Sequence, residues 1–510
     1  MDRTGLAVLG IDLGTSSVKA AVFDASGGLL SSSVRPYGIR VDSSGMAEQD
    51  PRDWVRASID AVRDALDGAG NVRVRAIGLT GQWSGTVPVD SNTEPLGNAI
   101  IWMDTRGARA VRRLAGGFPS LGGYRVDKLV RWIRITGGAP AMSGKDSLAH
   151  VLYLKEEEPD RYREAWKFLE PKDFLAARLT GSVKASWDNI ALMWCTDNRN
   201  PGNVMYDKGL VRLAGLQMDK LPEIVSPADA VGGLSREMAG ELGLGEGLPV
   251  ISGGGDMQCS LIGSGCTQEG EALLYLGTSS WITSHVKRKK TDVAHNIASL
   301  PAALPGLYFL AAEQENAGSC LEFACDLLGL KGDYGRVHEA VAASGESGAI
   351  FLPWLMGERA PVEEPWLRGG IFNVSLSTGK GEVIRSVMEG VALNSRWLLG
   401  PVDAFLGTRS EPLRMAGGCA LSPDWPQIYA DVTGRRVQVV RDPREATVRG
   451  AAMLAAMSTG LADMDAVRRC CLPYREFRPS GKDYSERYEV FLELYRKLRR
   501  EMRRMNSRQV

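Results

Sequence analysis

The chain has 510 residues, of which 44% are hydrophobic and 24% are charged, a composition typical of a globular protein with roughly two to four domains. Its formal net charge of +0 gives no indication of nucleic acid or an anionic membrane surface as a partner. No apolar run reaches the length of a membrane span, no signal peptide is recognisable, and the eight cysteines include no C-x-x-C pair, so we expect a cytoplasmic protein with reduced thiols.

The first predicted elements enclose a glycine-rich turn. Apolar runs at 6–9 and 18–23 flank the sequence Ile-Asp-Leu-Gly-Thr-Ser-Ser at 11–17, which predicts a β-hairpin whose backbone N–H groups can hold a phosphate. Asp12 points a carboxylate into the same space, where it can hold Mg²⁺. An ordinary hairpin with Asp12 as a local turn former is the alternative that this motif leaves open. The candidate phosphate ligands are Gly14, Thr15, Ser16 and Lys19.

Strands and helices alternate through the rest of the first half. Asp50-Pro51 is a helix-start signal with proline at the first helical position. Residues 146–180 have a mostly helical pattern that Gly181 closes. The further predicted strands are 29–34, 73–80 and 85–90, and the predicted helix is 51–69.

The middle of the chain repeats the opening motif. A buried strand from Leu248 leads through three glycines to Asp256, and residues 272–282 then read strand, Gly-Thr-Ser-Ser, strand. Two such copies predict two similar α/β halves that face each other, with Gly277 and Thr278 forming a second phosphate cradle. We place the domains at 1–250 and 251–465, followed by a helical tail at 466–510.

The last third is predominantly helical, with predicted helices at 314–329, 380–400 and 444–460. Between the last two, residues 415–425 combine a strand, a glycine turn and a helix start, and a base or ribose can lie against such a bare backbone. Its candidate residues are Gly417, Gly418 and Ser422, with a plain turn as the alternative. The pattern predicts an amphipathic helix at 484–505 that packs on its own domain or forms a dimer contact. The sequence is therefore compatible with a monomer and with a homodimer.

These parts match what phosphoryl transfer requires. The reaction needs a cradle for the phosphates, a metal ion to neutralise their charge, and a carboxylate that takes the proton of the acceptor hydroxyl. Asp256 is the natural base and Asp12 the natural metal holder, although a turn carboxylate or helix cap is the other interpretation of Asp256. The sequence contains no G-x-x-x-x-G-K-[ST] motif, which argues against a P-loop enzyme.

An ordered series of motifs covers almost the whole length. The chain resembles the FGGY carbohydrate kinases, and within them the xylulokinase-like branch. The motifs that carry the resemblance are Gly-Ile-Asp-Leu-Gly-Thr-Ser-Ser-Val-Lys at 10–19, Met-Ala-Glu-Gln-Asp-Pro at 46–51, Ile-Gly-Leu-Thr-Gly-Gln-Trp-Ser-Gly at 77–85, Ile-Trp-Met-Asp-Thr-Arg at 101–106, Pro-Lys-Asp-Phe at 171–174, Ser-Gly-Gly-Gly-Asp at 252–256, Leu-Gly-Thr-Ser at 276–279, Pro-Trp-Leu-Met-Gly-Glu-Arg-Ala-Pro at 353–361, Met-Glu-Gly at 388–390 and Ala-Gly-Gly-Cys-Ala-Leu-Ser at 416–422.

The resemblance implies an α/β fold of two actin-like (ribonuclease H-like) domains that flank a deep cleft, with ATP and Mg²⁺ as cofactors and a sugar or polyol as substrate. It implies that Asp256 deprotonates the acceptor hydroxyl and, with Asp12, lies at the metal. It also implies that Thr15 and Thr278 contact phosphate and that Gly418 and Ser422 contact adenosine. The positions at which the family contacts its sugar are occupied by Gln82, Trp83, Ser84, Asp104 and Met257.

Three departures from the xylulokinase pattern fall on the sugar side. Xylulokinases usually carry Met-His where this chain has Trp83-Ser84, and commonly Asn or Gln where it has Met257. The Asn-Asp pair of the family's Gly-Glu-Arg segment is replaced here by Val362 to Glu364. The resulting pocket is bulkier and less polar, which favours a related ketose, a pentitol or a less polar polyol over D-xylulose. A catalytically quiet nucleotide-binding sensor of the same fold is the alternative function.

Overall fold

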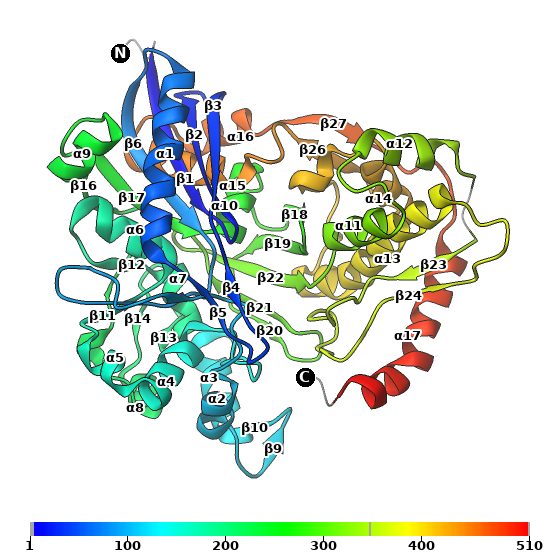
Figure 1. Cartoon of the computed structure of the whole chain (residues 1–510), viewed down its shortest axis with the longest axis horizontal. Coiled ribbons are helices and arrows are strands. Elements are labelled where there is room, and N and C mark those ends of the chain that lie inside the picture. The colour runs from blue at the N-terminus through cyan, green and yellow to red at the C-terminus, as the bar shows by residue number, and fades with distance from the viewer. Residues whose placement is uncertain (1–4, 346–347, 508–510) are drawn as a thin grey trace.

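The computed structural model describes residues 5–345 and 348–507 and contains two α/β halves side by side (Figure 1). The first half is built around a six-stranded sheet with the strand order β16-β17-β6-β1-β2-β3. The predicted opening hairpin is confirmed, because β1 and β2 pair as antiparallel neighbours. The strands of this sheet are β1 (Leu6–Leu13), β2 (Ser17–Asp24), β3 (Leu29–Pro36), β6 (Arg73–Gly81), β16 (Ala230–Gly233) and β17 (Pro249–Gly255).

The second half contains an eight-stranded sheet with the order β20-β21-β22-β19-β18-β25-β26-β27. Its central part, β22-β19-β18-β25-β26, repeats the order β3-β2-β1-β6-β17, with an antiparallel hairpin followed by two parallel neighbours in each case. The prediction of two similar halves is therefore confirmed. The strands are β18 (Ala272–Leu276), β19 (Ser280–Val286), β20 (Thr291–Asp292), β21 (Ile297–Pro301), β22 (Tyr308–Gln314), β25 (Leu413–Ala416), β26 (Val437–Val440) and β27 (Pro473–Phe477).

Helices cover both sheets. As predicted, α1 begins at Pro51, and the Asp50 side chain accepts a hydrogen bond from the backbone N–H of Arg52. The helices are α1 (Pro51–Ala69), α2 (Ala108–Ala115), α3 (Val126–Thr136), α4 (Ser147–Glu157), α5 (Pro159–Glu164), α6 (Pro171–Thr180), α7 (Trp187–Ile190), α8 (Lys208–Leu213), α9 (Arg236–Leu242), α10 (Asp256–Gly263), α11 (Gly318–Leu327), α12 (Tyr334–Ala343), α13 (Lys380–Leu406), α14 (Trp425–Thr433), α15 (Ala446–Ser458), α16 (Met464–Cys470) and α17 (Ser485–Asn506).

Short strands complete the connections, and two of the predicted helical segments are interrupted. The segment 146–180 divides into α4, α5 and α6: a new helix begins at Pro159, and residues 167–169 pair with 87–89 as β11 and β7 between α5 and α6. The segment 314–329 begins as the end of β22, so α11 starts only at Gly318. The remaining strands are β4 (Arg40–Val41), β5 (Ala47–Gln49), β7 (Val87–Val89), β8 (Ala99–Ile100), β9 (Ser120–Leu121), β10 (Tyr124–Arg125), β11 (Lys167–Leu169), β12 (Lys184–Ser186), β13 (Thr196–Asp197), β14 (Met205–Tyr206), β15 (Glu223–Val225), β23 (Ile350–Leu352) and β24 (Gly370–Phe372).

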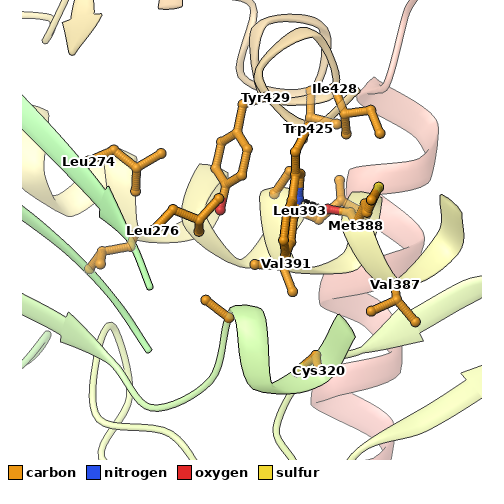
Figure 2. Packing of buried hydrophobic residues seen from close by; sticks show 14 of the residues in the cluster. Leu274, Leu276, Cys320, Val387, Met388, Val391, Leu393, Trp425, Ile428 and Tyr429 are labelled. Atoms are coloured by element: carbon orange, nitrogen blue, oxygen red, sulfur yellow. Dashed lines mark hydrogen bonds between the residues drawn. The ribbon is translucent and has the colours of Figure 1, made fainter. Parts of the chain in front are cut away.

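The core of the second half lies between its sheet and the helices α13 and α14. Leu274 and Leu276 of β18 share one core cluster with Tyr429 and Trp425 of α14 and with Val391 of α13 (Figure 2). The indole Nε1 of Trp425 donates a hydrogen bond of 3.0 Å to the backbone oxygen of Met388. Phe491 of α17 joins the same core, where its ring centroid lies 5.4 Å from that of Trp354. The tail helix therefore packs on the second half.

Helix α15 connects the two halves, since it follows β26 of the second sheet but packs on α10, β1 and β6 (Figure 1). Two glycines make this close approach possible. A Cβ atom at Gly78 of β6 would lie 2.0 Å from the backbone oxygen of Ala451, and one at Gly450 would lie 1.8 Å from the backbone oxygen of Cys259. The crossing of α10 and α15 is thus a backbone-to-backbone contact that a larger side chain would force apart.

The proposed domain limits at 250 and 465 stay predictions. In the structure, β17 extends the first sheet as far as Gly255, and β27 at 473–477 completes the second sheet. All eight cysteines are free thiols. Within the described residues, none of the helices combines the length and the hydropathy that a membrane crossing requires.

Candidate active site

Asp12 and Asp256 lie at the same edge of the first sheet. Asp12 is near the end of β1, opposite Thr80 of β6, and Asp256 follows directly after β17, whose last residue pairs with Gly81 of β6. Because β1, β6 and β17 are parallel neighbours, their carboxyl ends meet at one edge, where α/β folds bind their ligands. Two carboxylates from distant parts of the chain thus share one region.

The charges of these two carboxylates interact. Burial raises the pKa of Asp256 to about 7, and the negative charge of Asp12 is the second cause of this shift. Burial likewise raises the pKa of Asp12 to about 6, against the attraction of Lys19. The Oδ1 atom of Asp12 is buried and has no hydrogen-bond partner among the described residues. A cation next to these oxygens would relieve both the burial and the repulsion.

The second half faces the same carboxylates. Burial raises the pKa of Tyr275, at the end of β18, and the charges of Asp12 and Asp256 raise it further. The charge of Glu313 on β22 also contributes to the raised pKa of Asp256. Tyr275 stacks on Trp281 of β19 with a centroid distance of 4.1 Å and an interplanar angle of 1°, which fixes the base of the second hairpin.

The turn of the first hairpin is held by neighbouring side chains. Gly14 accepts a hydrogen bond from the Tyr37 hydroxyl, and the backbone oxygen of Thr15 accepts one of 2.7 Å from Gln49. The Thr15 hydroxyl accepts a hydrogen bond of 3.0 Å from the indole of Trp102. Ser16 is exposed at the tip of the turn.

Lys19 of β2 is engaged with the second half. Its ammonium donates a hydrogen bond of 2.5 Å to the backbone oxygen of Arg444 and lies 3.5 Å from a carboxylate oxygen of Glu445. It therefore fastens the first hairpin to the segment just before α15. Its role as a phosphate ligand stays a prediction.

The second hairpin turn and the glycine turn after β25 lie next to each other. A Cβ atom at Gly417, whose φ is +94°, would lie 2.5 Å from the backbone oxygen of Leu276. The backbone oxygen of Gly277 accepts a hydrogen bond of 2.8 Å from Gly318, and Thr278 is exposed. Bare backbone thus surrounds the second turn on two sides. Gly418 opens the short helix that follows, and the Ser422 hydroxyl accepts hydrogen bonds from Asp424 and Trp425 at the start of α14.

The residues expected on the sugar side are mostly buried and engaged. Gln82 donates to Gln49 at 2.9 Å, while its own Oε1 is buried without a partner among the described residues. Ser84 donates to the backbone oxygen of Lys145 at 2.9 Å. The carboxylate of Asp104 accepts hydrogen bonds from Arg106 and from the backbone N–H of Ala47. Asp104 therefore holds a loop in place, and a direct sugar contact of this residue stays a prediction.

Trp83 and Met257 belong to a core cluster that crosses between the halves. The Trp83 ring lies 5.6 Å from the ring of Phe309 on β22, and its Nε1 donates to the backbone oxygen of Asn189 at 2.9 Å. Met257, the residue after Asp256, is 4% exposed and lies in the same cluster. Both side chains thus form an apolar wall next to Asp256.

The sequence motifs did not predict a network of ion pairs that links the two halves. The Lys145 ammonium of the first half lies 3.6 Å from a carboxylate oxygen of Glu315, the residue after β22. The Arg359 guanidinium forms ion pairs with both Glu315 and Glu313. The Arg359 guanidinium also lies 5.6 Å from the ring centroid of Trp102. Arg359 belongs to the recognised Gly-Glu-Arg motif, but nothing in the sequence pattern shows which acidic residues it meets.

The site fits a magnesium ion that is held mainly through water. In the part of the chain that the structure describes, no group of three or more His, Cys, Asp or Glu side chains could hold a metal ion. Mg²⁺ commonly uses one or two carboxylates together with substrate phosphates and water. The unpartnered Oδ1 of Asp12 suits this arrangement.

Comparisons with known proteins identify the family of the chain. Residues 7–263 match the model for the N-terminal domain of the FGGY family of carbohydrate kinases, and residues 272–459 match the model for its C-terminal domain. The chain is 27% identical to the xylulose kinase of Bacillus subtilis over 98% of both chains. It is 31% identical to the xylulose kinase of Streptomyces rubiginosus over 91% of this chain and 90% of that one.

Solved structures share the fold. A xyloylose kinase from Brucella ovis has a TM-score of 0.83 at 26% identity and covers 96% of this chain and 99% of its own. Glycerol kinase from Plasmodium falciparum, solved with ADP, has a TM-score of 0.82 at 20% identity, over 97% of this chain and 98% of its own. The fold is thus the two-domain α/β fold of actin-like sugar kinases, as the resemblance implied. The chain belongs to the FGGY family of carbohydrate kinases, and it is a xylulokinase-like carbohydrate kinase.

Proposed function

We propose that this kinase transfers the γ-phosphoryl group of ATP to a hydroxyl of a pentulose or a related sugar or polyol, with Asp256 as the general base. The observation that carries the proposal is the pair of half-buried carboxylates, Asp12 and Asp256, which meet at one sheet edge, where the charge of Asp12 adds to the raised pKa of Asp256. A general base works best when its pKa lies near the operating pH, and burial raises the pKa of Asp256 to about 7.

The proposed step transfers the γ-phosphoryl group directly to the acceptor hydroxyl. The acceptor oxygen forms a bond to the γ-phosphorus, the bond between that phosphorus and the β,γ-bridging oxygen breaks, and ADP leaves with the electron pair. The proton of the acceptor hydroxyl passes to the carboxylate of Asp256. The apolar wall of Trp83 and Met257 next to Asp256 keeps water from competing as the acceptor.

The phosphates would lie between the two hairpin turns. Thr15 and Gly14 would contact them from the first half, and Gly277 and Thr278 from the second. Asp12 would hold Mg²⁺, which neutralises phosphate charge when it is bound. The turn of Gly417 and Gly418, with Ser422, would lie under the adenosine, because these glycines leave the backbone uncovered beside the second hairpin.

The experiment is a measurement of ADP release over a panel of D-xylulose, D-ribulose, xylitol, D-arabinitol and gluconate. The names of the relatives make D-xylulose the first sugar to test, whereas the apolar wall favours a less polar relative. We expect turnover with at least one pentulose or pentitol in the presence of Mg²⁺ and ATP. Retained ATP binding without ADP release for every sugar and polyol would instead support the nucleotide-binding sensor.

A further inference from the structure

Asn189 of α7 carries a buried amide with no partner. The residue is 0% exposed, and neither its Oδ1 nor its Nδ2 has a hydrogen-bond partner among the described residues. Burial of an unpaired amide is costly, and buried polar groups in folded proteins are nearly always paired. The missing partner is therefore the feature that needs an explanation.

The amide lies beside the proposed base. A Cβ atom at Gly255, the residue before Asp256, would lie 3.3 Å from Oδ1 of Asn189 and 3.6 Å from the Trp83 ring. Trp83 in turn donates its indole N–H to the backbone oxygen of Asn189 at 2.9 Å. Since Gly255 has no side chain, the amide and the indole both face the backbone that leads into Asp256. In the proposed function, this is the side of the site at which the sugar would bind.

The position of the amide is fixed by its neighbours. Asp188 accepts a hydrogen bond of 2.8 Å from the backbone N–H of Gly255, and the buried Lys172 donates to the backbone oxygen of Ser252 at 2.9 Å. Lys172 also binds Asp173. The bond between Gly255 and Asp188 ties α7 to the turn before Asp256, and the bond from Lys172 ties α6 to the strand that leads into the same turn, so Asn189 is held beside Asp256. A rigid polar group of this kind is suited to select a ligand.

We propose that Asn189 is a specificity-determining residue, whose amide binds a hydroxyl or carbonyl oxygen of the sugar next to the carbon that carries the acceptor hydroxyl. This inference rests on the proposed function. Because an amide both donates and accepts, it discriminates against analogues that lack the oxygen.

The test compares Asn189→Ala with Asn198→Ala. Asn198 is also 0% exposed, but its Nδ2 donates to the backbone oxygen of Thr136 at 2.8 Å, so it is a matched asparagine with a structural bond. For each variant we would measure the melting temperature without ligand, the affinity for the best sugar of the panel by calorimetry, and the KM for ATP.

For Asn189→Ala we expect a sugar affinity at least tenfold lower, an unchanged KM for ATP, and a melting temperature no lower than in the wild type, because no hydrogen bond of the free protein is lost. For Asn198→Ala we expect a lower melting temperature and unchanged sugar affinity. A sugar affinity within twofold of the wild type in Asn189→Ala, or a melting temperature that falls as in Asn198→Ala, overturns the inference. A wild-type protein without turnover on any sugar would overturn the proposed function instead.

Discussion

Replacing Asp256 by Asn should stabilise the protein, and more so as the pH rises. The carboxylate has a pKa of about 7 in the folded protein against 3.8 for the free side chain, so the folded state binds the proton more tightly than the unfolded state. The contribution of this carboxyl group to the stability of the wild type therefore falls as the pH rises from about 4 to about 7. Asparagine does not ionise, and its presence also removes the repulsion with Asp12.

The size of the effect follows from the shift. Between pH 5 and pH 7, an interval of two pH units, the ionisation of Asp256 lowers the free energy of unfolding of the wild type by roughly 3 kcal/mol, at about 1.36 kcal/mol per unit. Because the Asp256 carboxylate is partly exposed, we discount this to about 1–2 kcal/mol. For domains of this size the melting temperature changes by about 2–4 °C per kcal/mol. The advantage of the variant should grow by roughly 2–8 °C between pH 5 and pH 8.

The assay is thermal unfolding of wild type and Asp256→Asn at several pH values without nucleotide. Asp60→Asn, an exposed change on α1, is the control and should leave the pH dependence as in the wild type. A difference between Asp256→Asn and wild type that stays constant or shrinks as the pH rises would refute the reasoning about the buried carboxylate pair.

Three further predictions concern the pH dependence of turnover, the crossing of α10 and α15, and the phosphate contact of Thr278. The kcat/KM for the sugar should fall as the pH drops below about 7, because a protonated Asp256 cannot accept the hydroxyl proton; a profile that is flat from pH 5 to pH 9 would contradict this. Gly450→Ala should lower the urea midpoint of unfolding, by a change that corresponds to about 2 kcal/mol or more, because the new Cβ would lie 1.8 Å from the backbone oxygen of Cys259. Gly400→Ala is the control in α13, where a Cβ meets open space, and it should raise the midpoint slightly. A lower midpoint in both variants would disprove the steric reason. Thr278→Val should raise the KM for ATP about fivefold, as expected for the loss of one hydrogen bond worth about 1 kcal/mol, and leave the melting temperature unchanged because the residue is exposed; an unchanged KM would remove Thr278 from the phosphate site.

The sequence predicted the parts of the fold that local patterns encode. Apolar runs around the Gly-Thr-Ser turns predicted both hairpins, and the Asp50-Pro51 signal predicted the start of α1. The repeated motif also predicted the two halves with matching strand order. Residues 167–169 were included in a helical segment because their pairing with 87–89 is a contact between distant parts of the chain, which periodicity does not report.

The sequence also predicted the candidate site residues, and their roles stay predictions. Two motifs far apart in the chain identified Asp12 and Asp256, and the parallel strands β1, β6 and β17 bring them to one edge. The sequence did not show that Lys19 binds the Arg444–Glu445 segment or that Asp104 binds Arg106, because a motif gives the residue type and not its distant partners. Asn189 was missed for a further reason. It lies in no recognisable motif, and only the packing shows that its amide is buried without a partner.

The most direct test of the account is the turnover of Asp256→Asn with the best sugar of the panel, measured together with the affinity for Mg-ATP. General-base assistance contributes about 10²–10⁴-fold in rate, so we predict that kcat falls by that factor while the ATP dissociation constant changes by less than about threefold. A variant that retains more than about a tenth of the wild-type kcat would contradict the assignment of Asp256 as the base.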